Sequence, residues 1–195
     1  MATPGRIEAA RLFCSLDPPD WLVRHAIAVA EIASWLADQA ARRGIAVDRR
    51  VVEAAALLHD VDKLPAVRRM IGDSSHGEGS ATWVTRHGAP ELAEPVRNHP
   101  VTLLADETSA RRILTAPLEV RLVAYADKRA GQRLGTMDAR FRSWQRRYPD
   151  GWDPSLRRMI RMRAAELERG VLDELGVEAT SLRRLRWTPR AMAAA

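Results

Sequence analysis

The sequence predicts an all-α fold, in one compact domain with a C-terminal helical extension. Apolar side chains recur at helical spacing along most of the 195 residues. No alternating apolar–polar run is long enough to build a sheet, and no linker rich in Gly, Ser and Pro divides the chain. We expect residues 1–17 to precede the helical domain, residues 18–148 to form it, and residues 149–195 to form the extension and a tail.

Two helices are predicted in the first third of the chain. The first begins after Pro19 and ends at Gly44. Its apolar stripe contains Trp21, His25, Ala28, Val29, Ile32 and Leu36. The second is a strongly apolar helix over residues 51–58, and Asp48 is its expected N-cap.

The middle of the chain contains a helix-start pattern. Ser75 and Glu78 have the spacing of a capping box, which places His76 in the first turn of a helix that ends near Gly88. A shorter helix is expected over residues 91–98.

The second half is again helical in pattern. Residues 117–147 share the helical period, and Gly131 and Gly135 leave a kink or a break within them as an alternative. Asp153, followed by a proline, is typical of a helix start and predicts a helix over residues 154–170. A last helical piece is expected to follow it.

Composition excludes several classes of protein. No stretch approaches the roughly 18 uncharged apolar residues of a membrane span, and the first residues lack the apolar core of a signal peptide. Cys14 is the only cysteine, which excludes an intrachain disulfide and a cysteine-based zinc cluster. We therefore expect a cytoplasmic protein with no membrane partner. The net charge of +6 favours anionic partners, but on charge alone we interpret it as general solubility.

Four polar side chains stand where the helical pattern predicts apolar residues. His25 lies on the apolar stripe of its helix, and His59 and Asp60 close an apolar run. Asp127 lies on the inward face of a later helix. A buried carboxylate costs several kcal/mol unless it is paired or binds a metal, and one cation would satisfy all four groups. Each residue alone is explained by ordinary hydrogen bonds or by a neighbouring cation, but the coincidence of four favours a metal site.

The same residues carry a family resemblance. The order His25, His59-Asp60, Asp127 resembles the H…HD…D signature of the HD-domain superfamily of metal-dependent phosphohydrolases. The segment 57–63, Leu-Leu-His-Asp-Val-Asp-Lys, is similar to the family's "LLHDIGK" segment, and Ala-Asp-Lys at 126–128 resembles its "ADK" segment. The resemblance covers about residues 20–135. It implies a helical HD domain that hydrolyses a phosphate ester or phosphoanhydride of a nucleotide or a related small molecule.

The resemblance extends to a two-metal version of the family, similar to the diadenosine tetraphosphate hydrolases. It implies two further ligands, His76 before a small-residue helix start and His99 before a turn, with Asp60 bridging two ions. Pro100 departs from the threonine usual there, and Ser80-Ala81 shifts the small pair, which puts the substrate in doubt more than the metal. The implied ligand set is His25, His59, Asp60, His76, His99 and Asp127. Without the resemblance, a helix cap explains His76 and a turn explains His99; His87 is interpreted as a solvated helix end and is left out.

The implied cofactor is one or two divalent or transition metal ions, with Fe or Mn favoured and Zn, Ni, Co or Mg as alternatives. Paired ions make hydroxide available for in-line attack on a phosphoryl group. The predicted catalytic residues are Asp60, Lys63 and Asp62, where Asp62 orients the water or pairs with Lys63. The predicted phosphate contacts are Lys63, Lys128, Arg129 and Arg133. For Lys63, a surface cation explains the residue equally well.

Two rival functions are open at this point. A few members of the superfamily are di-iron oxygenases, which the ligand set does not separate from hydrolases. A non-catalytic nucleic-acid or nucleotide-binding module would use the arginine-rich stretch of residues 140–163, in which Trp144, Tyr148 and Trp152 are interleaved. These arginines recur around the whole helix, so we expect a solvated helix packed through its aromatics and no nucleic-acid partner. The expected partner is a small anionic phosphate, and a homodimer stays open.

Overall fold

The computed structural model describes residues 3–185, and the regular secondary structure of that part is entirely helical. This confirms the all-α prediction. In chain order the helices of the described residues are α1 (Arg6–Cys14), α2 (Asp20–Arg42), α3 (Arg49–Leu58), η1 (Val61–Lys63), α4 (Pro65–Ile71), α5 (Glu78–Arg86), η2 (Pro90–Leu92), α6 (Ala93–Arg97), η3 (Val101–Ala105), α7 (Glu107–Leu114), α8 (Leu118–Arg129), α9 (Met137–Arg147), α10 (Pro154–Leu175) and η4 (Ser181–Arg184).

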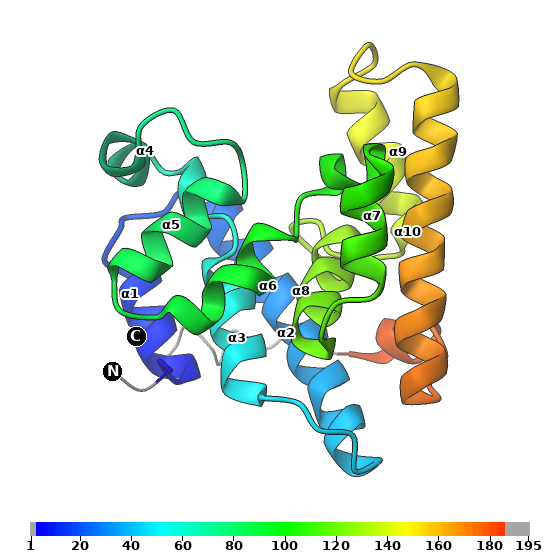
Figure 1. The fold of residues 1–195 in the computed structure, drawn as a ribbon, viewed down its shortest axis with the longest axis horizontal. Coiled ribbons are helices and arrows are strands. Elements are labelled where there is room, and N and C mark those ends of the chain that lie inside the picture. The colour runs from blue at the N-terminus through cyan, green and yellow to red at the C-terminus, as the bar shows by residue number, and fades with distance from the viewer. Residues whose placement is uncertain (1–2, 186–195) are drawn as a thin grey trace.

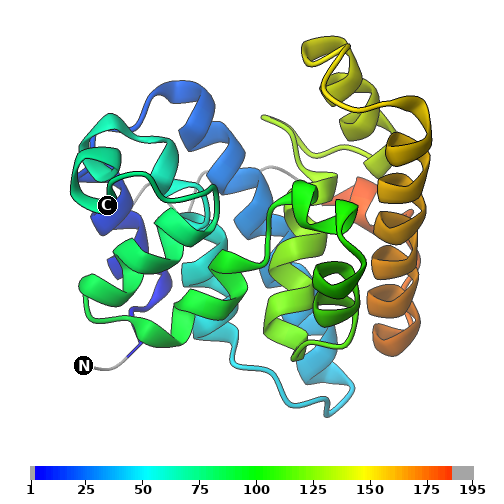
Figure 2. The same ribbon diagram turned by 45° about the horizontal axis from the view of Figure 1, so that its top comes forward.

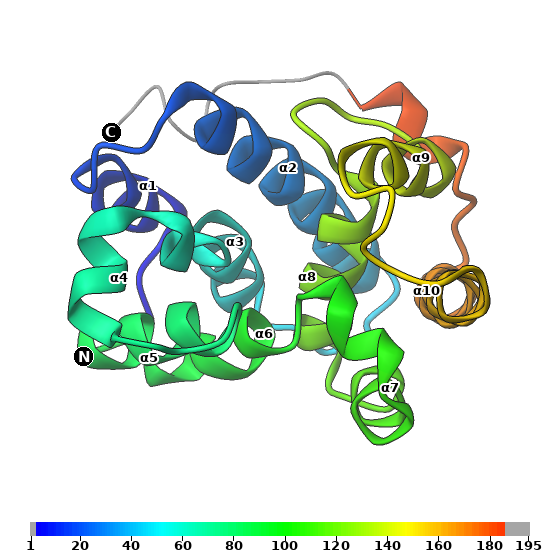
Figure 3. The ribbon, with the colours of Figure 1, turned by 90° about the horizontal axis from the view of Figure 1, so that it is seen from above.

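Helix α2 lies at the centre and packs against α3 and α8. Figure 3 shows α2 crossing the molecule, with α1, α4 and α5 at one end and α7, α9 and α10 at the other. The same division is visible in Figure 1. One continuous cluster of buried apolar side chains extends from Ala9 in α1 to Leu182 in η4. The segments at both ends of the described chain therefore share their core with the central helices.

Several predicted helix boundaries are confirmed. The Asp48 carboxylate accepts hydrogen bonds from two backbone N–H groups at the start of α3, and Asp153 caps α10 in the same way. Helix α10 runs on through Gly170 to Leu175, so the expected last helical piece consists of the end of α10 and the short η4. Burial of Val171 and Leu175 continues the apolar stripe beyond Gly170, and packing of this kind outweighs the low helix propensity of one glycine. The end of the expected tail, residues 186–195, lies outside the described residues.

The helical pattern over residues 117–147 proves to be two helices. Helix α8 ends at Arg129, residues 130–136 form an irregular crossing, and Thr136 caps the start of α9. Figure 2 shows α9 and α10 at one edge of the molecule, beyond this break. The break thus gives α9 a direction that is independent of α8.

The capping-box prediction is wrong. Helix α5 begins at Glu78, and Gly77 occupies its N-cap position with φ of 86°. A β-carbon on Gly77 would lie 2.7 Å from Pro100 Cγ and 2.8 Å from the Arg97 carbonyl oxygen. Both the positive φ and this close approach therefore require glycine at this position. His76 therefore precedes the helix instead of lying in its first turn.

Helices α1, α4 and α7 were not predicted, because at seven to nine residues they are too short for a clear helical period. None of the described helices combines the length and the apolar character needed to cross a membrane.

Candidate metal centre

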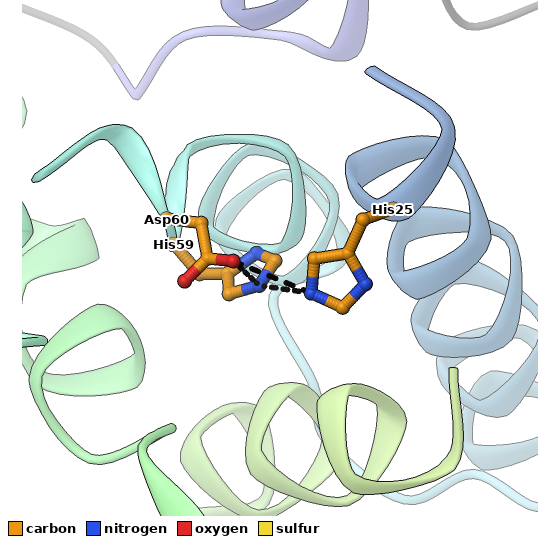
Figure 4. Close-up of side chains that lie close together, drawn as sticks. All are labelled: His25, His59 and Asp60. Carbon is orange, nitrogen blue, oxygen red and sulfur yellow. Dashed lines mark hydrogen bonds and ion pairs between the residues drawn. The ribbon is translucent and has the colours of Figure 1, made fainter. Parts of the chain in front are cut away.

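Three core helices bring four of the predicted residues together. His25 comes from α2, His59 and Asp60 follow α3, and Asp127 comes from α8. His25 Nε2 lies 3.2 Å from His59 Nε2, 3.3 Å from Asp60 Oδ2 and 3.2 Å from Asp127 Oδ1. Figure 4 shows His25, His59 and Asp60 pointing toward one another. We call His25, His59 and Asp127, together with Oδ2 of Asp60, the inner group.

Two histidines approach the other oxygen of Asp60. His76 Nε2 lies 3.5 Å and His99 Nε2 lies 3.3 Å from Asp60 Oδ1, and the two Nε2 atoms are 3.1 Å apart. We call His76 and His99, together with this oxygen, the outer group. Asp60 is 1% exposed and is shared by the two groups.

The backbone fixes which ring nitrogen faces inward. The Nδ1 atoms of His25, His59 and His99 lie 2.9, 2.8 and 2.6 Å from the carbonyl oxygens of Gly131, Ala56 and Val96. A carbonyl oxygen only accepts, so each Nδ1 carries a proton and donates it. A neutral ring then presents its Nε2 lone pair to the centre, as a metal ligand does. The Gly131 carbonyl is available because the chain leaves the helix after Arg129.

A carboxylate orients the fourth histidine. Both carboxylate oxygens of Asp62 lie 3.1 Å from His76 Nδ1, and Oδ2 also accepts a hydrogen bond of 2.7 Å from the Gly77 backbone N–H. Burial raises the pKa of Asp62, but the contacts with His76 and Gly77 outweigh it and hold that pKa below its usual value. The expected pairing of Asp62 with Lys63 is wrong, and its place behind His76 makes it a positioning residue for that ring.

The electrostatics of the two groups differ. Burial lowers the pKa of His25, but the carboxylates of Asp127 and Asp60 outweigh it and raise that pKa to about 9. Burial lowers the pKa of His99 to about 4, with only partial compensation from Asp60. Burial also raises the pKa of Asp60 and of Asp127, but neighbouring groups reverse this and hold both well below the usual range. For Asp60 these are His59, Lys63 and His25, and for Asp127 they are the imidazoles of His25, His59 and His99. Both carboxylates are therefore ionised at neutral pH.

The donor chemistry fits metal ions. Oδ1 of Asp60 is buried and has no hydrogen-bond partner among the described residues. Two Nε2 lone pairs at 3.2 Å repel each other unless a proton or a cation lies between them. The ligand atoms of His25, His59 and Asp60 lie within 4.8 Å of one another, and so do those of Asp60, His76 and His99. The buried His and Asp side chains can thus hold one ion or two.

Lys63 lies at the opening of this centre. Its Nζ is 2.6 Å from Asp60 Oδ2, and its side chain is 33% exposed. It lines two adjoining clefts, of about 470 and 420 Å³. His76 and Asp127 line the larger cleft, and His25 lines the smaller. The candidate metal centre therefore borders both clefts on the side where Lys63 lies.

The other expected phosphate contacts are placed differently. Lys128 is 0% exposed, and its Nζ donates to the carbonyl oxygens of His99 and Ala124. Arg129 is buried and donates to Tyr125 Oη, a Glu168 carboxylate oxygen and the Ala179 carbonyl oxygen. Both residues hold the fold together, so their assignment to an outer phosphate is wrong. Arg133 is exposed beside the smaller cleft, but in the irregular segment instead of one turn further along α8.

One residue near the centre was missed. Arg140 of α9 places a guanidinium nitrogen 3.8 Å from Asp127 Oδ1, and its side chain is 12% exposed. Arg140, Trp144 and Tyr148 recur every four residues, which was the available signal that they share a face. The expectation of a solvated arginine helix is wrong for Arg140. His87 stacks on Trp83, with ring centroids 3.9 Å apart, and is not part of either group.

Comparison with known proteins gives one match. The family model for the HD domain matches residues 22–131, which is more than half of the chain. The matched region contains all six residues of the inner and outer groups, but not α9 or α10. The search of curated proteins gave no significant match, and neither did the search of solved structures. On the family match, and on the helical fold that brings its histidines and aspartates together, this chain belongs to the HD-domain family.

Proposed function

We propose that this protein is a two-metal phosphohydrolase that cleaves a phosphate ester or phosphoanhydride of a nucleotide or a related small molecule. One observation carries the proposal: two groups of imidazole Nε2 atoms approach opposite oxygens of the same buried carboxylate, Asp60. His25, His59 and Asp127 would hold one ion, His76 and His99 the other, and Asp60 both.

The charge of such a centre suits phosphate. Two divalent ions and the two carboxylates Asp60 and Asp127 leave a net charge of about +2 when the histidines are neutral. Divalent ions bound here supply Lewis acidity toward phosphoryl oxygens and lower the pKa of a coordinated water toward neutrality. In the proposed hydrolysis, water would add to phosphorus and lose a proton, the bond from phosphorus to the leaving oxygen would break, and the leaving oxygen would take up a proton.

Two side chains complete the assignment. Lys63 is the one we assign to a phosphate oxygen, because its partly exposed side chain lines both clefts and its Nζ lies beside Asp60. Asp62 keeps His76 in its ligand orientation.

Dinucleoside polyphosphates belong among the candidate substrates together with mononucleotides and cyclic nucleotides.

Metal analysis and a substrate screen test the proposal. We expect up to two ions per chain in protein supplied with Fe²⁺ or Mn²⁺, and phosphate release from at least one compound of the screen. In ¹⁸O-labelled water, the label is expected in a hydrolysis product. His59→Ala is expected to lose both metal and activity, whereas His87→Ala removes an imidazole outside the centre and should keep both.

Two outcomes would overturn the proposal. If His59→Ala keeps full metal content and activity, the centre is not where hydrolysis occurs. If the wild-type protein consumes oxygen with an organic substrate and releases no phosphate, the chemistry is that of an oxygenase.

A further inference from the structure

Residues beyond the HD match form one wall of the larger cleft. Lys63, His76 and Asp127 line the cleft on the side of the metal centre, and Trp144, Tyr148 and Trp152 line it on the side of α9 and the loop that follows. Helix α9 and this loop lie at the edge of the molecule, after the break at residues 130–136 (Figure 2). The residues of the metal centre therefore lie within the matched HD domain. The cleft wall formed by Trp144, Tyr148 and Trp152 lies outside it.

Arg140 joins that wall to the metal centre. Its guanidinium carbon lies 4.6 Å from the centroid of the Trp144 ring, and one of its terminal nitrogens lies 3.8 Å from Asp127 Oδ1. Its Nε is buried and has no hydrogen-bond partner among the described residues. Stacking occupies the face of a guanidinium and leaves its in-plane N–H groups free to donate. A buried, unpaired N–H group is costly, and an anion beside the centre would satisfy it.

The cleft is cationic as well as aromatic. Among the described residues that line it, Asp127 is the only acid, and the cations are Lys63, Arg140, Arg142, Arg157, Arg158 and Arg161. Arg157 donates to backbone carbonyl oxygens and Arg161 pairs with Asp138, so part of this charge is used within the wall. The remaining positive charge favours a ligand with more than one negative charge.

Trp144 and Tyr148 follow Arg140 at intervals of four residues and both line the larger cleft. Trp144 lines both clefts, and Phe141 packs against it edge-to-face at 5.1 Å. Tyr148, one turn further, is 59% exposed at the end of α9. The Arg140 guanidinium covers one face of the Trp144 ring, and Trp144 also lines both clefts. A ring attached to a phosphate at Arg140 would reach Trp144 about one helical turn, or about 5 Å, further along α9.

We propose that Arg140 anchors the phosphate of the substrate, and that Trp144, with Tyr148 beside it, holds a planar ring attached to that phosphate, as in a nucleoside phosphate. This inference deepens the proposed function by naming the substrate class, and it rests on that function only in placing the bound phosphate at the metal centre. Arg140 contacts the substrate directly, and Trp144 determines specificity. Binding of this kind is measurable without turnover.

Paired ligands separate the two contacts. The probes are the phosphonate analogue of adenosine 5′-monophosphate, with a methylene group in place of the ester oxygen, and the same phosphonate of ribose without the base. Calorimetric titration of the metal-loaded protein is expected to show that Arg140→Gln weakens both ligands about tenfold or more. Trp144→Leu is expected to weaken the nucleoside phosphonate about tenfold and to leave the ribose phosphonate within twofold of wild type.

Arg146→Gln is the matched control. Arg146 is exposed on the same helix, lines neither cleft and carries the same charge as Arg140. We expect it to change neither affinity by more than twofold. Arg140→Lys and Trp144→Tyr serve where circular dichroism shows that the first variants do not fold; Arg140→Lys should weaken both ligands, and Trp144→Tyr should keep most of the preference for the nucleoside.

The inference and the proposed function fail separately. Equal weakening of both ligands by Trp144→Leu, or wild-type affinity in Arg140→Gln, would overturn the inference while phosphate release from ring-free esters still supported hydrolysis. The expected binding pattern without phosphate release from any nucleotide would support the inference and contradict hydrolysis. Tighter binding of single-stranded oligonucleotides than of the nucleoside phosphonate, with a steep salt dependence, would replace the proposed occupant by nucleic acid.

Discussion

The inner and outer groups of the metal centre are built in different ways. The residues of the inner group come from α2, α8 and the end of α3, which pack on one another in the core, and His25, His59 and Asp127 are all buried. The histidines of the outer group come from the loop before α5 and the turn after α6, and the His76 side chain is 39% exposed. Packing holds the inner group in place and buries His99 of the outer group as well, whereas His76 depends on polar contacts with Asp62 and His99.

This difference predicts that the two groups bind their ions with different affinities and have different roles in catalysis. A rigid, buried site holds its ion firmly, because its ligands need little reorganisation on binding. The half-exposed His76 lines the larger cleft, on the side where Arg140 and Trp144 stand. We therefore expect the inner ion to be the tightly held one, and the outer ion to exchange and to meet the substrate.

The largest expected effect comes from removing one imidazole from each group. His59→Ala is expected to abolish binding of both ions and to reduce phosphate release by a factor of 10³ or more. The substitution removes one of the imidazoles beside Asp60, the carboxylate that both groups share. His76→Ala is expected to keep about one ion per chain and to lose most of the activity. Elemental analysis of both variants checks the stoichiometry. Identical metal content in the two would show that the groups do not act as separate sites.

Asp62→Asn tests whether the contact between Asp62 and His76 supports metal binding by the outer group. The substitution keeps the size of the side chain but removes the charge next to His76 Nδ1. Loss of such a carboxylate–histidine contact typically costs about 10–100-fold in metal affinity, and we expect that loss for the outer ion alone. Competition with a chelator measures it. Weakening of the inner ion by the same factor would remove the distinction between the groups.

The pH dependence of metal binding tests the inner group. The pKa of His25 is raised to about 9 in the absence of metal, so His25 is protonated at pH 7 and a metal must displace that proton. The affinity of the inner ion should rise about tenfold per pH unit up to pH 9 and then level off. His99, with a pKa of about 4, is already neutral at pH 7 and adds nothing to this slope. Calorimetry of His76→Ala in buffers of different ionisation enthalpy counts the proton, and release of none would contradict the expectation.

The two groups also differ in how well the sequence predicts them. His25, His59, Asp60 and Asp127 stand out because helical periodicity demands apolar residues at their positions. His76 and His99 come only from the family resemblance, because a cap or a turn explains each of them locally. The HD match covers all six positions.

Residues whose surroundings depend on tertiary packing were beyond prediction. Arg140 faces the centre because the chain breaks after α8 and re-aims α9, and two glycines in a helical pattern indicate a break without giving its direction. Lys128 was expected to contact phosphate, but it is buried and its Nζ donates to the carbonyl oxygens of His99 and Ala124. Short helices such as α4 carry too few residues for a period to show.

The smallest expected effect concerns the link between the two groups. Lys128 lies next to Asp127 of the inner group in sequence, and its Nζ donates a hydrogen bond of 2.7 Å to the carbonyl oxygen of His99 of the outer group. Burial lowers its pKa to about 8, only partly offset by Asp127, so Lys128 is still largely protonated at pH 7 and its hydrogen bond is charge-assisted. Lys128→Met fills the same space without donating. Since a net hydrogen bond contributes about 1 kcal/mol, we expect the outer ion to bind about threefold to tenfold more weakly and the inner ion to be unchanged, as read by chelator competition. An equal loss of affinity for both ions would mean that Lys128 supports α8 as a whole. Unchanged affinity for both would mean that the turn at His99 keeps its position without the hydrogen bond from Lys128.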